Sequence, residues 1–467
     1  MTDSPTVAIA GGGLAGLAAA CALADSGFRV TLFERRPYLG GRASSYEHPG
    51  TGEVVDNCQH VLFRVCTNLV EFYRRIGVED KIRWYEDMTF IEPGGRSSVM
   101  HASPLPAPLH TAPSFLRFPF LTGKDKLAIS RAIAALALRK QADTGQSFRQ
   151  WCERHGQTRN AVERFWKPIL VSALSEDLDL ISVPYAAQVV RESMKSPAAR
   201  HMGVPSIPLT DLYNRAGDYI RARGGEIRFR NSFEAFSREP GRVRICTGDG
   251  EVDFDYLVLA LPFDGLARVL PQSAETAPLR EKLAHFKSAP ITGIHLWFDR
   301  QISDLDHAVL LDRTIQWMFH KSRLLEGRGA EAKTESHGSY IELVVSASKN
   351  LIDKSRSEIV DLALKEVREF FPVARTANLV KSTVIKEVHA TYSPRPGIDA
   401  YRPQQATEWP RVFLAGDWTA TGWPATMEGA VRSGYLAAEA LANAAEGKPH
   451  RFLMPDLPAT GLMRIFH

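Results

Sequence analysis

The opening of the chain alternates between the hydrophobic patterns of strand, helix and strand. The apolar run TVAIA at residues 6–10 predicts a buried strand, the alanine-rich stretch 14–24 has helical composition, and GFRVTLFE at 27–34 predicts a second strand. All 18 residues from Val7 to Ala24 are apolar or glycine, a length that would suffice for a membrane span. Glycines at positions 11, 13 and 16 separate strand from helix, so the pattern favours a strand–turn–helix unit instead.

Later hydrophobic patterns predict a helical part and further strands. Apolar residues recur at helical spacing in KDKLAISRAIAALALRK and YAAQVVRESM, within residues 124–200. Residues 225–262 read as a meander of short strands that ends in the buried strand YLVLALP. A second sheet is predicted from APITGIHLWFDR, RTIQWMFHKSR and GSYIELVVSAS, and an amphipathic helix from EIVDLALKEVREFF. Finally, RVFLAGDWTATGWPATMEGAVRSGYLAAEALANA repeats the opening strand, turn and helix.

A proline-rich apolar segment interrupts these patterns. Residues 100–123, MHASPLPAPLHTAPSFLRFPFLTG, carry prolines at a density that argues against a regular helix or a central strand. A simple linker would be more polar. We therefore expect an irregular apolar segment that lines or covers a cavity.

Length and composition bound the class of protein. A chain of 467 residues exceeds the usual size of one core, so two joined domains are expected. A net charge of +4, with scattered Lys and Arg, does not indicate nucleic-acid binding. The five cysteines form no C-x-x-C pair and are odd in number, which favours a reducing cytoplasm and gives no support for a metal site.

The glycine turn has the chemistry of a dinucleotide site. In G-x-G-x-x-G, the glycines permit a tight turn, close approach of the pyrophosphate and close packing of helix on strand, while the helix N-terminus supplies amide donors. Glu34 lies 18 residues beyond Gly16, where an acidic residue accepts hydrogen bonds from ribose hydroxyls and would repel a 2′-phosphate. The predicted contacts here come from Gly11, Gly13, Leu14, Ala15, Gly16, Glu34 and Arg35.

These motifs carry a family likeness. GGGLAGLAAACALADSGFRVTLFERRPYLGGRASS resembles the FAD fingerprint of the flavin amine oxidase and phytoene desaturase superfamily, and VFLAGDWTATGWPATMEGAVRSGYLAA is similar to its second FAD motif. The resemblance implies FAD as cofactor and an α/β fold, in which a Rossmann-like FAD-binding domain is joined to an interleaved α+β substrate-binding domain. We predict the former from residues 1–75, 205–285 and 405–450 and the latter from 76–204 and 286–404.

The middle of the chain narrows this likeness. VVDNCQHVLF, FWKPILVSALSEDLDLISVPYAAQVVRESM, SAPITGIHLWFDR, IQWMFHK and YIELVVSAS look like the squalene-associated branch, whose members are hydroxysqualene dehydroxylases of bacterial squalene and hopanoid synthesis. The likeness spans Val7 to about Ala445. It implies that the substrate is a triterpene alcohol, hydroxysqualene, and that reductive dehydroxylation yields squalene.

The resemblance also implies further site residues. Gly41 and Arg42 would approach the pyrophosphate or the flavin, Gly416 and Asp417 would lie near the ribityl chain, and the pair Thr426 and Met427 would open the last helix beneath the flavin. The less favoured alternative for Asp417 is a plain N-cap or turn residue.

Asp56 and His60 are the candidate proton donors. In dehydroxylation an acid protonates the hydroxyl, water leaves, and hydride from reduced flavin quenches the allylic cation; either residue can instead be structural. Members of the branch typically have glycine where this chain has Cys58, which would strain the backbone if that position needs a positive φ.

Three alternatives stay open. A carotenoid-type desaturase would use oxidised flavin to take hydride from an isoprenoid. An amine oxidase would want an aromatic cage, for which Trp418 and Trp423 are available, although packing explains both equally. A non-catalytic FAD-bearing subunit of an isoprenoid synthase complex is the third. The electron donor and the oligomeric state are not defined by the sequence.

An isoprenoid substrate dissolves in the bilayer, so we expect a cytoplasmic protein that touches the inner face of the cytoplasmic membrane. The same apolar side chains can instead line the cavity or the core. The candidate surface comprises Leu105, Leu109, Phe115, Leu116, Phe118, Phe120 and Leu121, with Arg117, Lys124 and Lys126 for anionic headgroups.

Overall fold

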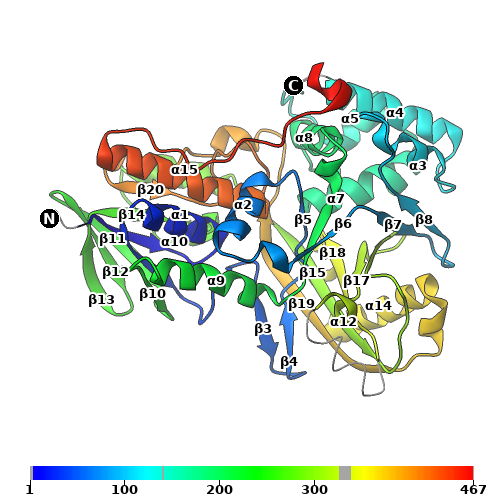
Figure 1. Ribbon diagram of the computed structural model, residues 1–467, viewed down its shortest axis with the longest axis horizontal. Helices are drawn as coiled ribbons and strands as arrows, with labels where there is room; N and C mark the ends of the chain where they lie inside the picture. The colour runs from blue at the N-terminus through cyan, green and yellow to red at the C-terminus, as the bar shows by residue number, and fades with distance from the viewer. Residues whose placement is uncertain (1–3, 139–140, 326–337, 466–467) are drawn as a thin grey trace.

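A five-stranded parallel sheet organises the first of two structural units in the computed structural model, which describes residues 4–138, 141–325 and 338–465 (Figure 1). The strand order is β10 (Glu226–Phe229), β2 (Arg29–Glu34), β1 (Thr6–Ala10), β14 (Tyr256–Leu259) and β20 (Val412–Leu414). All five strands fall within the ranges predicted for the FAD-binding domain. Three distant stretches of the chain therefore meet in one sheet.

Both faces of this sheet are buried, because alternate residues of a strand point to opposite sides. Val7 and Ile9 belong to one core, and Ala8 and Ala10 belong to another. The first core is shared with the helices α1 (Leu14–Asp25), α2 (Thr67–Arg75), α9 (Leu209–Arg221) and α15 (Met427–Glu446). The second is shared with the predicted meander, β11 (Phe233–Glu239), β12 (Arg242–Thr247) and β13 (Gly250–Phe254). The apolar run 7–24 thus ends up inside the protein, and none of the helices in the described ranges is long and apolar enough to cross a bilayer.

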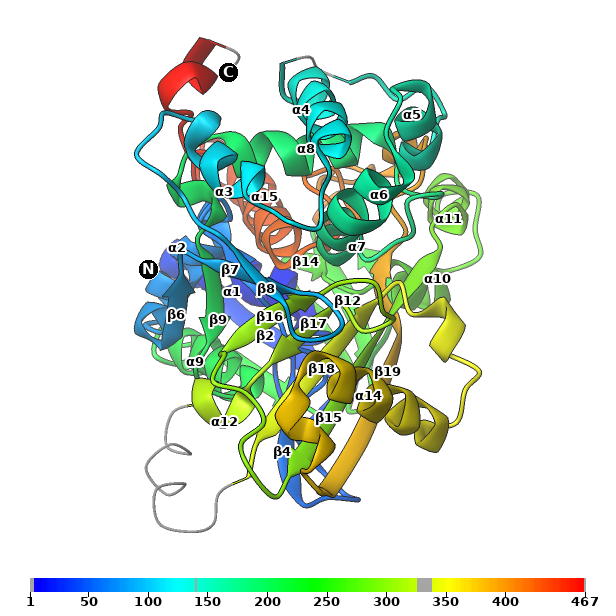
Figure 2. The ribbon, with the colours of Figure 1, turned by 90° about the vertical axis from the view of Figure 1, so that its right-hand side faces the viewer.

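A mixed seven-stranded sheet forms the second unit. Its order is β19 (Leu379–Tyr392), β15 (Ser288–Phe298), β18 (Tyr340–Ser346), β17 (Trp317–Phe319), β16 (His307–Leu310), β7 (Met88–Ile91) and β8 (Ser97–Met100). One face packs on α14 (Arg356–Phe370), the predicted amphipathic helix. The other faces a layer of helices (Figure 2): α3 (Ala112–Leu116), α4 (Gly123–Leu138), α5 (Phe148–Arg154), α6 (Arg159–Ala161), α7 (Lys167–Leu174) and α8 (Val183–Met194).

Smaller elements join the two units. The hairpin β3 (Ser45–His48) and β4 (Glu53–Asp56) leads to the sheet of β5 (Leu62–Phe63), β9 (Met202–Pro205) and β6 (Ile82–Tyr85). That small sheet pairs strands from both predicted domains. The remaining α-helices named here are α10 (Phe263–Val269), α11 (Ala277–Ala284) and α12 (Lys321–Leu324).

The proline-rich segment 100–123 is more regular than the sequence analysis predicts. It holds a 3₁₀ turn at Leu109–Thr111 followed by α3, whose first turn contains Pro113, where a missing N–H costs nothing. Phe118 and Phe120 are buried and stack at 4.7 Å between ring centroids.

The predicted membrane-facing set therefore divides in two. Its aromatic members fill the core, as does one leucine, which is the alternative stated above for them: Phe115, Phe118, Phe120 and Leu121. Three leucines remain exposed: Leu105, Leu109 and Leu116.

Candidate active site

A cavity of about 930 Å³ extends from the glycine turn of the first unit to the apolar face of the second. At one end Gly11, Glu34 and Arg42 line it. At the other end the lining is mostly apolar: Ile133, Phe165, Val189, Trp317, Phe319 and Val344. One continuous space thus connects the predicted cofactor residues with the predicted substrate domain.

The three glycines of the turn have different structural roles. Gly11 has φ +110°, and a Cβ there would lie 2.6 Å from the Ala260 carbonyl oxygen, so only glycine fits. At Gly13 a Cβ would meet nothing closer than the Gly41 Cα at 3.9 Å, so this residue faces open space in the cavity.

Gly16 requires a correction. A Cβ at this position would lie 2.0 Å from the Gly11 carbonyl oxygen, so the residue allows α1 to pack on the turn. It does not line the cavity, and the predicted contact with the pyrophosphate is therefore not supported.

The N-terminus of α1 is ready to receive an anion. Its N-cap, Gly13, makes no side-chain capping hydrogen bond, and the first turn holds no acidic residue. Leu14 and Ala15 of that turn line the cavity. The first amides of a helix lack intrahelical acceptors and carry positive partial charge, so this end of the cavity fits the pyrophosphate of FAD.

Glu34 closes the same end of the cavity. Its Oε2 accepts from the Gly12 amide and its Oε1 from the Arg36 amide, both at 2.8 Å. Arg35 also lines the cavity, and Arg36 Nη1 donates to the Gly41 carbonyl at 2.8 Å. Glu34 therefore braces the glycine turn as well as facing the cavity. Arg36 links Glu34 to the backbone of Gly41, another predicted site residue.

Arg42 and Asp417 form an ion pair across the cavity wall. Arg42 Nη2 lies 2.6 Å from Asp417 Oδ1, and Nη1 donates to the Ala390 carbonyl at 3.1 Å. Burial opposes the charge of Arg42, but the Asp417 carboxylate outweighs it and raises the pKa of Arg42. Gly416, Asp417, Gly41 and Arg42 all line the cavity, so residues 375 apart in sequence meet there.

The last helix begins at the cavity as the resemblance implies. Thr426 is the N-cap of α15, and its hydroxyl accepts from the Gly429 amide at 3.0 Å. Thr426 and Met427 both line the cavity. Predicted and observed helix starts agree.

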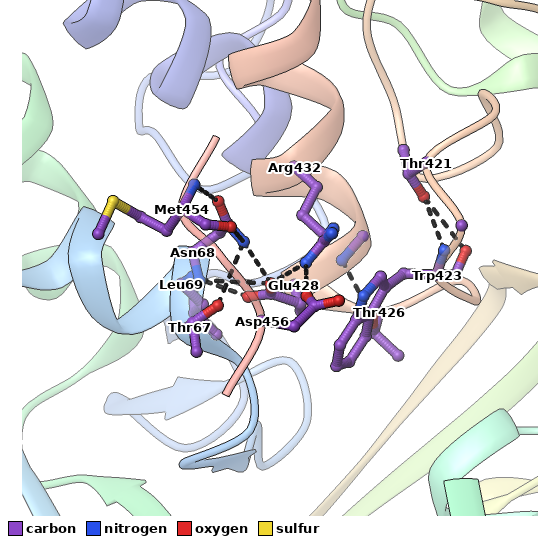
Figure 3. Close-up of polar contacts among 12 residues, drawn as sticks. Thr67, Asn68, Leu69, Thr421, Trp423, Thr426, Glu428, Arg432, Met454 and Asp456 are labelled. Atoms are coloured by element: carbon purple, nitrogen blue, oxygen red, sulfur yellow. Dashed lines mark hydrogen bonds and ion pairs between the residues drawn. The ribbon is translucent and has the colours of Figure 1, made fainter. Parts of the chain in front are cut away.

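Glu428 is a cavity-lining residue that sequence reasoning missed (Figure 3). Its carboxylate accepts from the Leu69 amide at 2.8 Å and from the Asn68 side chain at 2.9 Å, and so caps α2, whose own N-cap makes no side-chain bond. Burial raises its pKa. Arg432 Nη1 lies 3.3 Å from Glu428 Oε1 and 2.6 Å from Asp456 Oδ1, so this arginine links the two carboxylates. The capping box that would reveal such a role in sequence is absent, because the cap comes from another helix.

Asp56 is held away from the cavity. It does not line the cavity, and its Oδ2 lies 2.6 Å from Lys321 Nζ, while Ser45 donates to its Oδ1 at 2.6 Å. Burial opposes ionisation, but the Lys321 charge outweighs it and lowers the pKa of Asp56. An ionised carboxylate without access to the cavity cannot protonate a substrate, so the prediction for Asp56 is corrected.

Lys321 organises this buried cluster. Its ammonium also donates to Gln59 Oε1 at 2.8 Å and lies 3.5 Å from Glu342 Oε2. Burial raises the pKa of Glu342 to about 8. The segment 57–60, which lines the cavity, is thus anchored at both ends by one buried amine from α12. Lys321 ends the quoted segment IQWMFHK, but the sequence does not indicate that its side chain is buried against Asp56.

His60 faces the cavity as a neutral ring. Its Nδ1 lies 2.7 Å from the Cys58 carbonyl oxygen, which can only accept, so Nδ1 carries the proton and Nε2 keeps a lone pair. Burial lowers the pKa of His60. Cys58 is not among the described non-glycine residues with positive φ, so the strain considered for it does not arise.

The two tryptophans considered for an aromatic cage are separated. Trp418 is fully buried outside the cavity lining, and its Nε1 donates to the Leu261 carbonyl at 3.0 Å. Of the two tryptophans, only Trp423 lines the cavity. In the part of the chain that the structure describes, no group of His, Cys, Asp and Glu side chains has the arrangement of a metal site.

Comparison with known proteins places this site in context. The model of the family described as flavin containing amine oxidoreductase matches residues 14–442. Curated relatives include 15-cis-phytoene desaturase of Synechococcus elongatus, 28% identical over 93% of this chain and 95% of the relative. A probable zeta-carotene desaturase from the same organism is 28% identical over 94% of this chain and 98% of the relative.

Solved structures share the fold. A putative protoporphyrinogen oxidase from Exiguobacterium sp. superposes with a TM-score of 0.66 at 19% identity, covering 94% of this chain and 98% of that one. Cyclohexylamine oxidase from Brevibacterium oxydans superposes with a TM-score of 0.68 at 17% identity, covering 95% and 100%.

Proposed function

Because this chain belongs to the family of flavin-containing amine oxidoreductases and its cofactor is FAD, we propose that it is a desaturase acting on a long polyisoprenoid chain. Two features support this proposal. The curated relatives that match over nearly the whole length are named for phytoene and zeta-carotene desaturation. The cavity joins the cofactor residues to a mostly apolar lining, which suits an isoprenoid chain.

The protonation state of the His60 ring is the observation that supports a desaturation reaction. Bound FAD supplies an acceptor for a hydride from carbon. A double bond then forms when the neighbouring carbon loses a proton. His60 lines the cavity with a ring whose Nε2 keeps a lone pair, and burial lowers its pKa, so its neutral ring can take that proton.

Reductive dehydroxylation of hydroxysqualene is the second candidate. The resemblance of the middle segments to the squalene-associated branch supports it. This reaction needs an acid at the cavity, and the neutral His60 is a poor one. Glu342 carries a proton near neutral pH but lies outside the cavity lining. Glu428 lines the cavity and burial raises its pKa, but its two oxygens accept from the Asn68 side chain and the Leu69 amide. The described site therefore favours proton acceptance over proton donation.

Anaerobic single turnovers separate the two reactions. Oxidised holoprotein mixed with phytoene is expected to bleach its flavin absorbance and to yield a product with a longer conjugated system. Reduced holoprotein mixed with hydroxysqualene tests the alternative through the appearance of squalene. If only the second mixture reacts, the desaturase proposal is wrong; if neither reacts, both substrate assignments are wrong, while the FAD content still reports on the cofactor.

We also propose that the enzyme loads its substrate from a membrane surface, through an apolar rim formed by Leu105, Leu109, Leu116, Leu462 and Ile465. Leu109 is 47% exposed and also lines the cavity, so the cavity reaches the surface at this point. The Leu462 amide donates to the Ala107 carbonyl at 2.8 Å, which brings the two segments of the rim together. Exposed apolar side chains beside Arg117 and Lys124 suit an anionic bilayer.

Liposome co-sedimentation tests the rim. The triple variant Leu105→Ser, Leu116→Ser, Leu462→Ser is expected to bind phosphatidylglycerol-containing vesicles several-fold less than the wild type, with unchanged FAD content. Val373→Ser, Val380→Ser is the matched control, because these valines are exposed on other elements. Equal loss in both variants, or no loss in the triple variant, would contradict the rim.

A further inference from the structure

A buried arginine without a counter-ion stands in the cavity wall. Arg200 ends the 3₁₀ turn Ala198–Arg200, is only 8% exposed and lines the cavity. Its Nη2 donates to the Met100 carbonyl at 3.1 Å, and its Nη1 has no hydrogen-bond acceptor. Within the described ranges, no carboxylate forms an ion pair with this guanidinium.

The surroundings of Arg200 do not neutralise it. The carboxylate of Glu192, which also lines the cavity, is paired with Lys195, whose Nζ lies 3.0 and 2.8 Å from its two oxygens. His110 is fully buried, its two ring nitrogens have no partner, and burial together with the Arg200 charge lowers its pKa to about 4. Asp87 acts on Arg200 only from the exposed surface. The local balance of charge is therefore positive.

An uncompensated buried cation is costly, and proteins otherwise pair such groups. A guanidinium presents several donors that match an oxyanion, and it cannot give up its proton. The apolar residues Met100, Met194 and Pro108 line the same cavity as Arg200. The wall thus combines one cationic donor group with a surface for a hydrocarbon chain.

We propose that Arg200 is a subsite for the oxyanion of an amphiphile whose apolar chain occupies the cavity. The ligand class is an isoprenoid phosphate or diphosphate, or a fatty-acid carboxylate, since these share an oxyanion on a long apolar chain. Such an occupant uses the same apolar wall as a hydrocarbon substrate and competes with it. The competition rests on the proposed function, whereas the binding does not.

Calorimetric titration of the holoprotein tests the subsite, because bound FAD already fills the pyrophosphate site. The probes are farnesyl diphosphate, oleate, farnesol and inorganic pyrophosphate. At least one anionic amphiphile is expected to bind about 10- to 100-fold more tightly than farnesol, and pyrophosphate alone only weakly. The tighter of the two anionic amphiphiles identifies the source of the oxyanion. Farnesol binding as tightly as both anions would overturn the proposal, with no variant needed.

Arg200→Met is expected to remove this 10- to 100-fold preference and to leave farnesol binding unchanged. Arg200→Lys, which keeps the charge without the planar donor fork, is expected to retain part of it. Melting of ligand-free Arg200→Met should not occur below the wild-type temperature, since the change removes an uncompensated buried charge. A large drop in melting temperature with unchanged affinity for the anions would make Arg200 a structural residue and overturn the subsite. Turnover is not measured here, so a failed desaturase assay does not affect the result.

Discussion

The two ends of the cavity are held in place by different kinds of interaction. At the cofactor end, the backbone of residues 11–16 forms the turn, and Glu34 braces it through hydrogen bonds to main-chain amides. The substrate end begins at the segment 57–60, whose Asn57 side chain donates to the Arg42 carbonyl at 2.8 Å. This segment is anchored by the side chain of Lys321, which lies 265 residues from Asp56 in sequence. The first arrangement depends on the absence of side chains, and the second on the pairing of buried charges.

This difference teaches where each end is vulnerable. A turn made of backbone fails when a side chain fills the space in front of it, although the fold around it survives. A segment tied to a buried ammonium fails when the ammonium is removed, because a buried carboxylate is then left without its partner. The cofactor end should therefore lose binding before stability, and the substrate end stability before binding.

The largest effect is expected at Gly13. Gly13→Leu has room for its Cβ, so the protein should fold, but the side chain would occupy the space that faces the cavity and abolish FAD retention. The measurement is the flavin released by acid precipitation. Gly248→Leu is the control, because no heavy atom lies within 4 Å of a Cβ placed there. A yellow Gly13→Leu protein would contradict the backbone account of this end.

The next effect is expected at Lys321. Lys321→Met should lower the free energy of unfolding by about 3–5 kcal/mol, because it leaves the buried Asp56 uncompensated. Urea titration measures it. Arg74→Met breaks the exposed pair with Glu79 and should cost about 1 kcal/mol or less. Adding Asp56→Asn to Lys321→Met should recover part of the loss; a strictly additive double variant would show that the two residues are not coupled.

His60 sharpens the comparison within the substrate end. His60→Gln should keep its FAD and lower kcat of desaturation about 100-fold, the size of a lost general base. Since burial lowers the pKa of His60, the wild-type rate should hold through neutral pH and fall only as pH drops through a value below 6.5. The acid limb should disappear in the variant. An acid limb that persists there would assign the proton to another group.

The smallest effect is expected at Asp417. Asp417→Ala removes the partner of Arg42 and should weaken FAD binding roughly 10-fold, while the melting temperature of the apoprotein changes little. Equilibrium dialysis against FAD measures the affinity. Asp218→Ala removes an exposed carboxylate of α9 and is the control. If the substitution lowers the melting temperatures of apoprotein and holoprotein by the same amount, Asp417 is a structural residue instead.

Sequence reasoning reached most of the cofactor end. The glycine turn and Glu34 line the cavity as expected, because they belong to a local motif whose spacing reflects strand, turn and helix geometry. Arg42, Asp417 and Thr426, which the family resemblance implied, line it as well. Gly16 was misplaced, since the motif alone does not say which glycine packs the helix and which faces the ligand.

The substrate end was less accessible. Asp56 stands in a polar cluster that resembles a catalytic one, and only its burial beside Lys321 shows its structural role. Phe118 and Phe120 are apolar in a proline-rich segment, a pattern shared by membrane-facing and core side chains. Arg200 lies outside the quoted motifs, and Glu428 lies within the second FAD motif without any feature that sets it apart there. What distinguishes the two residues is the presence or absence of partners from distant elements.

The sequence by itself determined the α/β class and the strand, turn and helix of a dinucleotide site, because these depend on hydrophobic period and on glycines a few residues apart. The identity of FAD came from the resemblance of the two terminal motifs to a flavoprotein superfamily. The tertiary structure decided which charges are paired, which aromatic rings are buried and which groups face the cavity. Those outcomes depend on contacts between residues hundreds of positions apart, such as Asp56 with Lys321 and Arg42 with Asp417. Local patterns do not reveal such pairings, because the residues beside a lysine in sequence do not indicate which distant carboxylate it will meet.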